Sequence, residues 1–374
     1  MIRDAFDRGL DNPRKYILGI DIGKTKIEAR VFEIKNGVLE DSPITPVIQP
    51  TQKGVSAHVN QICMIITDMM TQVRNRKGVL GSVGIGFPLP FDRQGAIRPE
   101  MGSNLGTGFD GVDIKAEYIA GLSGVMRLPA IHLGLDSDVM LAGMLETLKN
   151  KTGKRDDISG KQIALFGIGT GVGYSIAKVD KSGKHHPVPL ESIISQVFLK
   201  VDDEDMALLQ AARSRLGKPA CTDTVRAAGL FSGTMINALA GVSDGRDIDI
   251  VNPQHVQALR FAGKYMARLV AMIKTGEFAE AGPTGNWLYA DRITASKTDI
   301  YMVGGGMGRS ALGAEIIKYA ESELSRSGIT GLKFMHIPAI NPAVYGAAVL
   351  AHKTNKPSSR RIGHGAQENS ALRP

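Results

Sequence analysis

The sequence predicts an α/β protein built from two lobes with a cleft between them. A short apolar strand ends at Asp21 in a glycine turn and is followed by a returning strand, and the same succession recurs at Gly169. The polar, charged stretch 151–161 lies between these two units and is the best linker candidate. The chain has 374 residues, which at roughly 100–200 residues per domain also suggests two units.

The first unit is expected to alternate strands and helices. Apolar or alternating runs predict strands at 16–23, 26–34, 79–87 and 130–134, of which the second reads as the returning strand of a hairpin. Helices are expected at 55–75, 112–122 and 138–149. The apolar residues that share one face of the first helix are Val59, Ile62, Ile66, Met69 and Val73.

The second unit repeats this alternation. Strands are expected at 162–168, 174–179 and 300–303, the last of which leads into three glycines. Helices are expected at 203–216, 222–240, 253–274, 310–325 and 342–352. The polar stretch 280–297 is interpreted as an inserted loop.

Composition excludes several classes of protein. No run of about 18 apolar residues is present, so no membrane span is expected. Cys63 and Cys221 cannot form a disulfide framework or a cysteine-rich zinc site, and a reducing cytoplasm is the simplest interpretation. The net charge of +8 is spread along the chain, and its densest run, 353–361, reads as a solvated tail. Aromatic residues make up 5% and do not interleave with a basic stripe, so no nucleic acid is expected.

The first candidate binding motif is the turn GIDIGKTK at 19–26. Glycine lets backbone N–H groups approach an anion, and Asp21 at the strand end could hold a hydrated Mg²⁺. A Walker A loop would need glycine where Leu18 stands, so the GKT triplet does not form one. Taken alone, the segment is equally compatible with a plain hairpin.

Two further glycine turns follow predicted strands. They are GIGTGVG at 167–173 and GGGMG at 304–308. Each is weak by itself, because a tight turn between strands needs glycine for conformational reasons alone. All three turns in this order and at these separations form a far more specific signal.

With these motifs in place, the sequence resembles the ROK and bacterial glucokinase branch of the sugar-kinase, actin-like ATPase superfamily over about 16–352. DIGKTK at 21–26 resembles its D-x-G-G-T-K phosphate loop, GIGFPLPFD at 84–92 its G-I-G-x-P-G-P-x-D turn, and SNLG at 103–106 with DGV at 110–112 its P-N-L-G-W and D-G-V/I-P-L elements. LDSD at 135–138 stands where the family has N-D-A-N, GTGVG at 169–173 resembles G-T-G-I-G, GGG at 304–306 the adenosine-side glycines, and YGAA at 345–348 the closing L-G-A-A. Seven matches in order would rarely occur by chance.

The resemblance implies a two-lobed actin-like ATPase (ribonuclease H-like) fold with a nucleotide cleft between the lobes, and phosphoryl transfer from Mg²⁺·ATP to a sugar-like hydroxyl. Asp136 matches the catalytic Asp of the family and would act as general base. Either Asp136 or Asp138 could also cap the helix that starts beside them. The residues that the resemblance assigns to the nucleotide are Asp21, Gly23, Lys24, Thr25, Lys26, Gly169, Thr170, Gly171, Gly304, Gly305 and Gly306, with Mg²⁺ held by Asp21 through water. The residues that it assigns to the substrate are Asn104, Leu135, Asp138, Glu191 and Asp223.

Several positions depart from the family pattern. Lys24 replaces the second of two adjacent glycines, where it could contact phosphate or crowd the loop. Leu135 replaces an Asn that holds a sugar hydroxyl, and Ile194 replaces the His of the G-E-x-G-H element, whose acidic residue survives as Glu191. Asp223 is the nearest match to a further substrate Glu, and the C-x-C-G-x-x-G-C zinc motif is absent. These departures put plain glucose in doubt and favour an unusual ring.

The expected lobes are 16–140 together with a C-terminal helix at about 341–352, and 141–340, followed by a tail at 353–374. The leading hypothesis is a cytoplasmic ATP-dependent kinase for a sugar or a cyclitol, with a carbasugar of secondary metabolism as the favoured acceptor. The alternative is a catalytically silent ROK-like sensor of sugar or nucleotide, which Lys24 and Leu135 would suit. About fifteen residues precede Tyr16, too few for the winged helix–turn–helix of ROK repressors. A DNA partner is therefore not expected, and a homodimer is left open.

Overall fold

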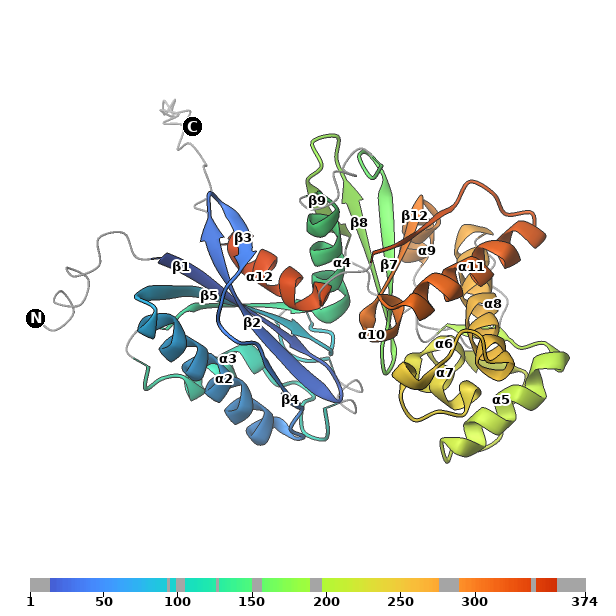
Figure 1. The fold of residues 1–374 in the computed structure, drawn as a ribbon, viewed down its shortest axis with the longest axis horizontal. Helices are drawn as coiled ribbons and strands as arrows, with labels where there is room; N and C mark the ends of the chain where they lie inside the picture. Colours follow the sequence, from blue (N-terminus) through green and yellow to red (C-terminus); the bar gives the residue numbers. More distant parts are fainter. Residues whose placement is uncertain are drawn as a thin grey trace, which may run out of the picture.

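The computed structural model describes residues 14–92, 95–98, 105–125, 128–149, 157–188, 197–275, 289–337 and 341–354. Two large β-sheets lie next to each other, with the helices α4 (Asp136–Thr147) and α12 (Pro342–Thr354) between them (Figure 1). This is the two-lobed α/β arrangement that the sequence predicts.

The first sheet has the strand order β3-β2-β1-β5-β6, with β4 paired to β2. Its strands are β1 (Arg14–Ile22), β2 (Lys26–Lys35), β3 (Val38–Asp41), β4 (Val47–Pro50), β5 (Gly78–Phe87) and β6 (Ala130–Leu135). β1 runs antiparallel to β2 and parallel to β5, and this register places Asp21 opposite Glu28. The predicted hairpin is confirmed. The strands β3 and β4 are missing from the prediction because four-residue strands offer too short a pattern.

Helices cover both faces of this sheet. Leu18 and Ile20 of β1 belong to the apolar cluster that includes the buried face of α2 (Val55–Asn75) and residues of α3 (Ile114–Gly121). Ile17, which directly precedes Leu18, packs instead with Val344 and other residues of α12. Because alternate side chains of β1 are buried on opposite faces, the strand reads as a continuous apolar run. The predicted apolar face of α2 is confirmed, since all five of its residues are buried.

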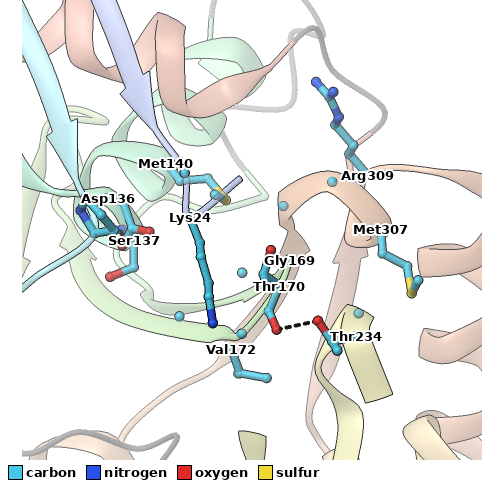
Figure 2. A pocket seen from close by; sticks show the side chains of 18 of the residues that line it. Lys24, Asp136, Ser137, Met140, Gly169, Thr170, Val172, Thr234, Met307 and Arg309 are labelled. Carbon is cyan, nitrogen blue, oxygen red and sulfur yellow. Dashed lines mark hydrogen bonds between the residues drawn. The ribbon is translucent and has the colours of Figure 1, made fainter. Parts of the chain in front are cut away.

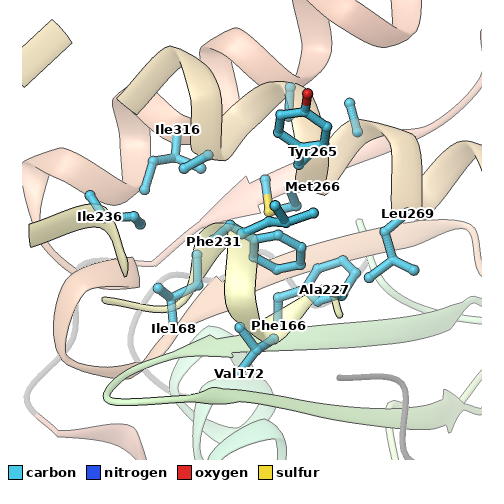
Figure 3. Packing of buried hydrophobic residues seen from close by; sticks show 14 of the residues in the cluster. Phe166, Ile168, Val172, Ala227, Phe231, Ile236, Tyr265, Met266, Leu269 and Ile316 are labelled. Carbon is cyan, nitrogen blue, oxygen red and sulfur yellow. The ribbon is translucent and has the colours of Figure 1, made fainter. Parts of the chain in front are cut away.

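The second sheet has the order β13-β12-β7-β8-β9. Its strands are β7 (Gln162–Ile168), β8 (Val172–Val179), β9 (His185–Val188), β12 (Ile300–Gly304) and β13 (Lys333–His336). One face packs against α8 (Pro253–Thr275) and α11 (Ala311–Arg326), where Phe166 lies among Phe231 and Met266 (Figure 3). On the other face, Leu165 packs with Met144 of α4. Apolar side chains therefore pack against both faces of β7.

The helices α4 and α12 approach each other at glycines. A Cβ at Gly346 would lie 1.8 Å from the carbonyl oxygen of Val139, and a Cβ at Gly143 would lie 1.9 Å from that of Pro342. No side chain fits there, so the two backbones can meet only with glycine at both positions. This contact fixes α4, and with it Asp136 at its first turn, against the end of the chain that returns to the first sheet.

The helix predicted at 222–240 is wrong in its first part. The segment folds as β11 (Thr224–Arg226), α6 (Ala228–Phe231) and α7 (Gly233–Ala240), preceded by β10 (Phe198–Lys200) and α5 (Asp203–Arg215). Thr224 and Val225 are β-branched and pair with β10, while the Ser232 hydroxyl accepts from the N–H of Met235 and so starts α7 afresh.

The loop expected at 280–297 also needs correction, because its described part forms α9 (Tyr289–Ser296), while 280–288 lie outside the described residues. Within the described ranges, none of the helices combines the length and the apolar character that crossing a bilayer requires.

Candidate active site

A cavity of about 1290 Å³ lies between the two sheets. Its walls come from the β1–β2 turn, the start of α4, the β7–β8 turn, the start of α7, and α10 (Gly305–Gly308) (Figure 2). It brings together these residues predicted to bind nucleotide: Asp21, Gly23, Lys24, Thr25, Lys26, Gly169, Thr170, Gly171, Gly305 and Gly306. Segments more than 100 residues apart in the sequence thus meet at one site, as the order of glycine turns predicts.

The β1–β2 turn presents backbone donors to the cavity. The N–H of Gly23 closes the turn on the carbonyl oxygen of Lys26 at 2.9 Å, and the Thr51 hydroxyl donates to the carbonyl of Gly23 at 2.7 Å. Within the described part of the chain, the N–H groups of Lys24 and Thr25 donate to no other group. Donors left free in a turn that lines a cavity suit an anion such as phosphate.

The β7–β8 turn also presents N–H groups to the cavity, and residues at the start of α7 fix its position. The N–H of Gly233 donates to the carbonyl of Gly169 at 2.7 Å, and the Thr234 hydroxyl donates to that of Thr170 at 3.0 Å (Figure 2). A Cβ at Gly233 would lie 2.6 Å from the Gly169 oxygen, so this close contact requires glycine. The N–H groups of Thr170 and Gly171 find no acceptor among the described residues. Gly233 and Thr234 were not predicted as site residues, because a continuous helix was expected at 222–240.

The third glycine motif forms the strand end and the one-turn helix α10. Gly305 has φ of +83°, and a Cβ there would lie 2.5 Å from the carbonyl oxygen of Ile168. Gly305 and Gly306 line the cavity. Gly304 does not line it. A Cβ on Gly304 would lie 3.0 Å from the sulfur atoms of Met140 and Met144, so that glycine serves packing behind the cavity wall.

Asp136 occupies the first turn of α4 at the edge of the cavity. Burial raises its pKa from 3.8 to about 7, and the charges of Asp21 and Asp138 add to the effect, while the N–H of Ser137, which donates to Oδ1 at 2.5 Å, opposes it. A carboxyl group with a pKa near 7 can take up a proton from a hydroxyl and release it again near neutral pH. The helix-cap alternative is not what the structure shows, since the N-cap is Leu135, which makes no side-chain cap.

Asp138 and Leu135 flank Asp136 and also line the cavity. The Ser175 hydroxyl of β8 donates to Oδ1 of Asp138, and burial raises the pKa of Asp138. Leu135 is half-buried and presents an apolar side chain where a polar one would be needed to hold a hydroxyl. The wall beside Asp136 is therefore acidic on one side and apolar on another.

Asn341 completes the floor of the cavity and was not predicted. Its Nδ2 donates to Oδ2 of Asp21 at 2.9 Å and to Oε2 of Glu28 at 3.1 Å. Burial raises the pKa of Asp21, the charge of Glu28 raises it further, and the hydrogen bond from Asn341 acts against both. For Glu28, burial also favours the neutral acid, but hydrogen bonds from Asn341 and Arg30 outweigh it and lower the pKa. One amide thus holds two neighbouring carboxylates together.

Asp21 suits Mg²⁺ better than the other acidic cluster of the described chain. Its Oδ1 remains for a cation or a metal-bound water, and a cation there would offset the repulsion from Glu28. Asp202, Glu204 and Asp205 also place carboxylates within 4.8 Å of one another. However, the ammonium group of Lys264 lies 2.7–2.8 Å from each of them, so each carboxylate already has a cationic partner.

Three predicted substrate contacts do not gain support from the structure. Asn104 and Glu191 lie outside the described residues, as does Ile194. Asp223 is exposed and does not line the cavity. Its carbonyl accepts from the N–H of Val201 at 2.6 Å, because the strand β11 that follows it pairs with β10 at a distance from α4. Asp223 is therefore removed from the candidate site.

Solved structures with the same fold include sugar kinases and a transcriptional regulator. A Balamuthia mandrillaris glucokinase in complex with glucose is 13% identical, with 90% of this chain and 94% of that chain covered and a TM-score of 0.57. An inorganic polyphosphate/ATP-glucomannokinase from an Arthrobacter strain is 18% identical, with 90% and 98% covered and a TM-score of 0.52. A ROK-family transcriptional regulator, a homolog of the E. coli MLC protein, is 14% identical, with 94% and 83% covered and a TM-score of 0.52.

These comparisons confirm the fold that the motifs implied. The chain has the two-lobed actin-like ATPase fold of the ROK hexokinases and glucokinases. No protein-family model and no curated protein sequence matches the chain.

Proposed function

We propose that the protein is an ATP-dependent kinase that phosphorylates a hydroxyl of a sugar or sugar-like cyclitol, with Asp136 as the general base. One observation carries the proposal: the half-buried carboxyl group of Asp136, with a pKa of about 7, shares a cavity with two turns that each hold two N–H groups without an acceptor among the described residues. The fold is that of solved sugar kinases, which supports the same reaction class.

Different residues of the cavity have different roles in this reaction. Asp136 takes the proton of the attacking hydroxyl as the phosphoryl group arrives. The N–H groups of Thr25 and Thr170 hold phosphate oxygens from the two sides of the cavity, and Gly305 lets the chain pass close to the adenosine. Mg²⁺ bound near Asp21 would supply charge neutralisation on the phosphates. Closure of the cavity around both substrates excludes water, which would otherwise compete with the acceptor.

The apolar wall beside Asp136 bears on the acceptor. Leu135 lines the cavity where the family pattern has an amide, so a ring hydroxyl pressed against it would lose its hydrogen bonds to water without replacement. The acceptor is therefore a ring that is less polar or differently substituted on that side. A cyclitol, a deoxy sugar or a modified amino sugar fits, and a carbasugar is the favoured member of this class.

An ATP-consumption assay over a panel of sugars and cyclitols tests the proposal. The wild-type chain should consume ATP with at least one acceptor, and Asp136→Asn should do so about 10²–10⁴-fold more slowly. Asp223→Asn is the matched control, because it removes one exposed carboxylate outside the cavity. Binding of sugar and nucleotide without turnover by any acceptor would instead favour the alternative, a catalytically silent sensor.

A further inference from the structure

Lys24 fits the β1–β2 turn without distorting it. Among the described residues, the non-glycine positions with a left-handed φ are Asn36 and Lys77, and Lys24 is not one of them. The turn closes through the N–H of Gly23 and continues into paired strands at Ile22 and Ile27. A second glycine is therefore not required by the backbone, and the lysine does not crowd the loop.

The side chain of Lys24 extends from the β1–β2 turn into the cavity. Figure 2 shows it pointing toward the β7–β8 turn of the other lobe, beside Thr170 and Val172. Its ammonium group has no hydrogen bond or ion pair within the described ranges. The neighbouring cations differ in this respect: the ammonium group of Lys26 lies 3.8 Å from Glu28, and that of Lys53 donates to the carbonyl of Lys24 at 2.5 Å. Lys24 thus brings an uncommitted positive charge to the cavity.

We infer that Lys24 is a phosphate-binding residue that holds the terminal phosphates of the nucleotide from the first lobe while the β7–β8 turn holds them from the second. The inference rests on the proposed function and adds to it a residue that the family's glycine cannot replace. A lysine offers a full point charge, whereas a backbone N–H offers a neutral donor, and charge-assisted hydrogen bonds are roughly twice as strong as neutral ones.

The same charge acts on the reaction itself. During transfer, negative charge is spread over the equatorial oxygens of the phosphoryl group, and a fixed cation beside them stabilises that state. Lys24 approaches from the lobe opposite to Thr170, so the phosphates lie between two sets of donors. Affinity should therefore depend on how many phosphates the nucleotide carries beyond the first.

Calorimetric titration of the full chain with ATP, ADP and AMP, each with Mg²⁺, tests this inference. Lys24→Met keeps an unbranched side chain that is one heavy atom shorter and carries no charge, Lys24→Gly introduces the second glycine of the family pattern, and Lys24→Arg keeps the charge. Lys15→Met makes the same change of net charge on an exposed part of β1 outside the cavity. For Lys24→Met and Lys24→Gly we expect about 10-fold or greater loss of ATP affinity, with AMP binding within about 2-fold of wild type. Lys24→Arg and Lys15→Met should stay close to wild type.

Two results would overturn the inference. One is unchanged ATP affinity in Lys24→Met and Lys24→Gly, and the other is an equal loss for ATP and AMP, which would place Lys24 at the nucleoside or in the turn's structure. Wild-type chain that binds none of the three nucleotides would overturn the kinase proposal itself. The two failures are therefore told apart by the wild-type titration alone.

Discussion

Asn341 reaches back over 320 residues to donate a hydrogen bond to the carboxylate of Asp21 at 2.9 Å. The same Nδ2 atom also donates to Oε2 of Glu28 at 3.1 Å. The Oδ1 atom accepts from the N–H of Ala343 at 3.2 Å and so caps α12. The residue therefore joins the start of the last helix to Asp21, which lines the cavity, and to the buried Glu28 beside it.

Replacement of Asn341 by alanine should cost more than the loss of a helix cap. It removes the shared donor of the half-buried Asp21 and the buried Glu28, of which Glu28 keeps its hydrogen bond from Arg30, and a buried polar group that loses its partner costs about 1–3 kcal/mol. The matched control is Asn252→Ala, because Asn252 caps α8 through Gln254 at 2.9 Å and holds no carboxylate by the hydrogen bonds described. Urea unfolding should show a clearly larger loss of unfolding free energy for Asn341→Ala. Equal losses would show that Asn341 acts as a cap alone.

Asp136→Asn should lower kcat by about 10²–10⁴-fold, which is the usual cost of removing a general base. The affinity for ATP should stay near that of wild type, since the side chain is assigned to the acceptor and not to the nucleotide. Steady-state kinetics together with calorimetry of ATP binding separates the two effects. Normal turnover in this variant would remove the assignment, and Asp138, which also lines the cavity, would be the next candidate.

The raised pKa of Asp136 also predicts a stability effect. Its pKa is about 7 in the folded protein and near 3.8 when exposed, so between these values the folded chain binds a proton that the unfolded chain has lost. The contribution of Asp136 to stability is therefore full below about pH 4 and declines as the pH rises toward 7. Asp136→Asn should raise the unfolding free energy by at least about 1 kcal/mol at pH 8 and by much less near pH 4. An equal effect at both pH values would contradict the raised pKa.

The glycines at the end of β12 offer a matched pair of substitutions. Gly305→Ala places a Cβ 2.5 Å from the Ile168 oxygen and requires a left-handed φ of +83°, whereas a Cβ at Gly306 meets nothing within 4 Å. Strain of this kind costs on the order of 1–3 kcal/mol. Gly305→Ala should therefore lower both the unfolding free energy and the affinity for ATP, while Gly306→Ala leaves stability near wild type. If both variants unfold like wild type, the close contact at Ile168 is not what fixes this turn.

The glycine turns show why much of the fold could be predicted. At Gly23, Gly169 and Gly305 the chain must turn directly after a buried strand. This requirement is local, so a few adjacent residues are enough to predict the turn. The order of these turns was then enough to indicate two lobes and the cavity between them. The short edge strand β9 and the division of 222–240 were missed, since their form depends on partners elsewhere in the chain.

The site residues that could be predicted belong to short local motifs, namely the glycine turns and the LDSD segment at 135–138. Asn341 binds Asp21 because α12 returns to the first sheet. The resemblance placed the helix at 341–352 with the first lobe, but no motif singled out Asn341 as the residue that contacts Asp21. Ser175 meets Asp138 because β8 lies against α4, which is again a matter of packing. Contacts of this kind arise from the assembled fold, so the residues that make them need the structure to be found.

Leu135→Asn tests what the apolar wall does to the choice of acceptor. Glucose, hydroxylated all round, should be a poor substrate of the wild-type chain, because a hydroxyl left without a partner against Leu135 costs about 1–3 kcal/mol. Asparagine would restore a donor and an acceptor at that place, and it also suits the N-cap of α4 that Leu135 now occupies, so the variant should fold at least as well. We expect kcat/KM for glucose to rise by about 10-fold, while the value for a deoxy sugar or cyclitol that packs on Leu135 falls. A wild-type value for glucose as high as that of the best acceptor would show that the wall does not select the substrate.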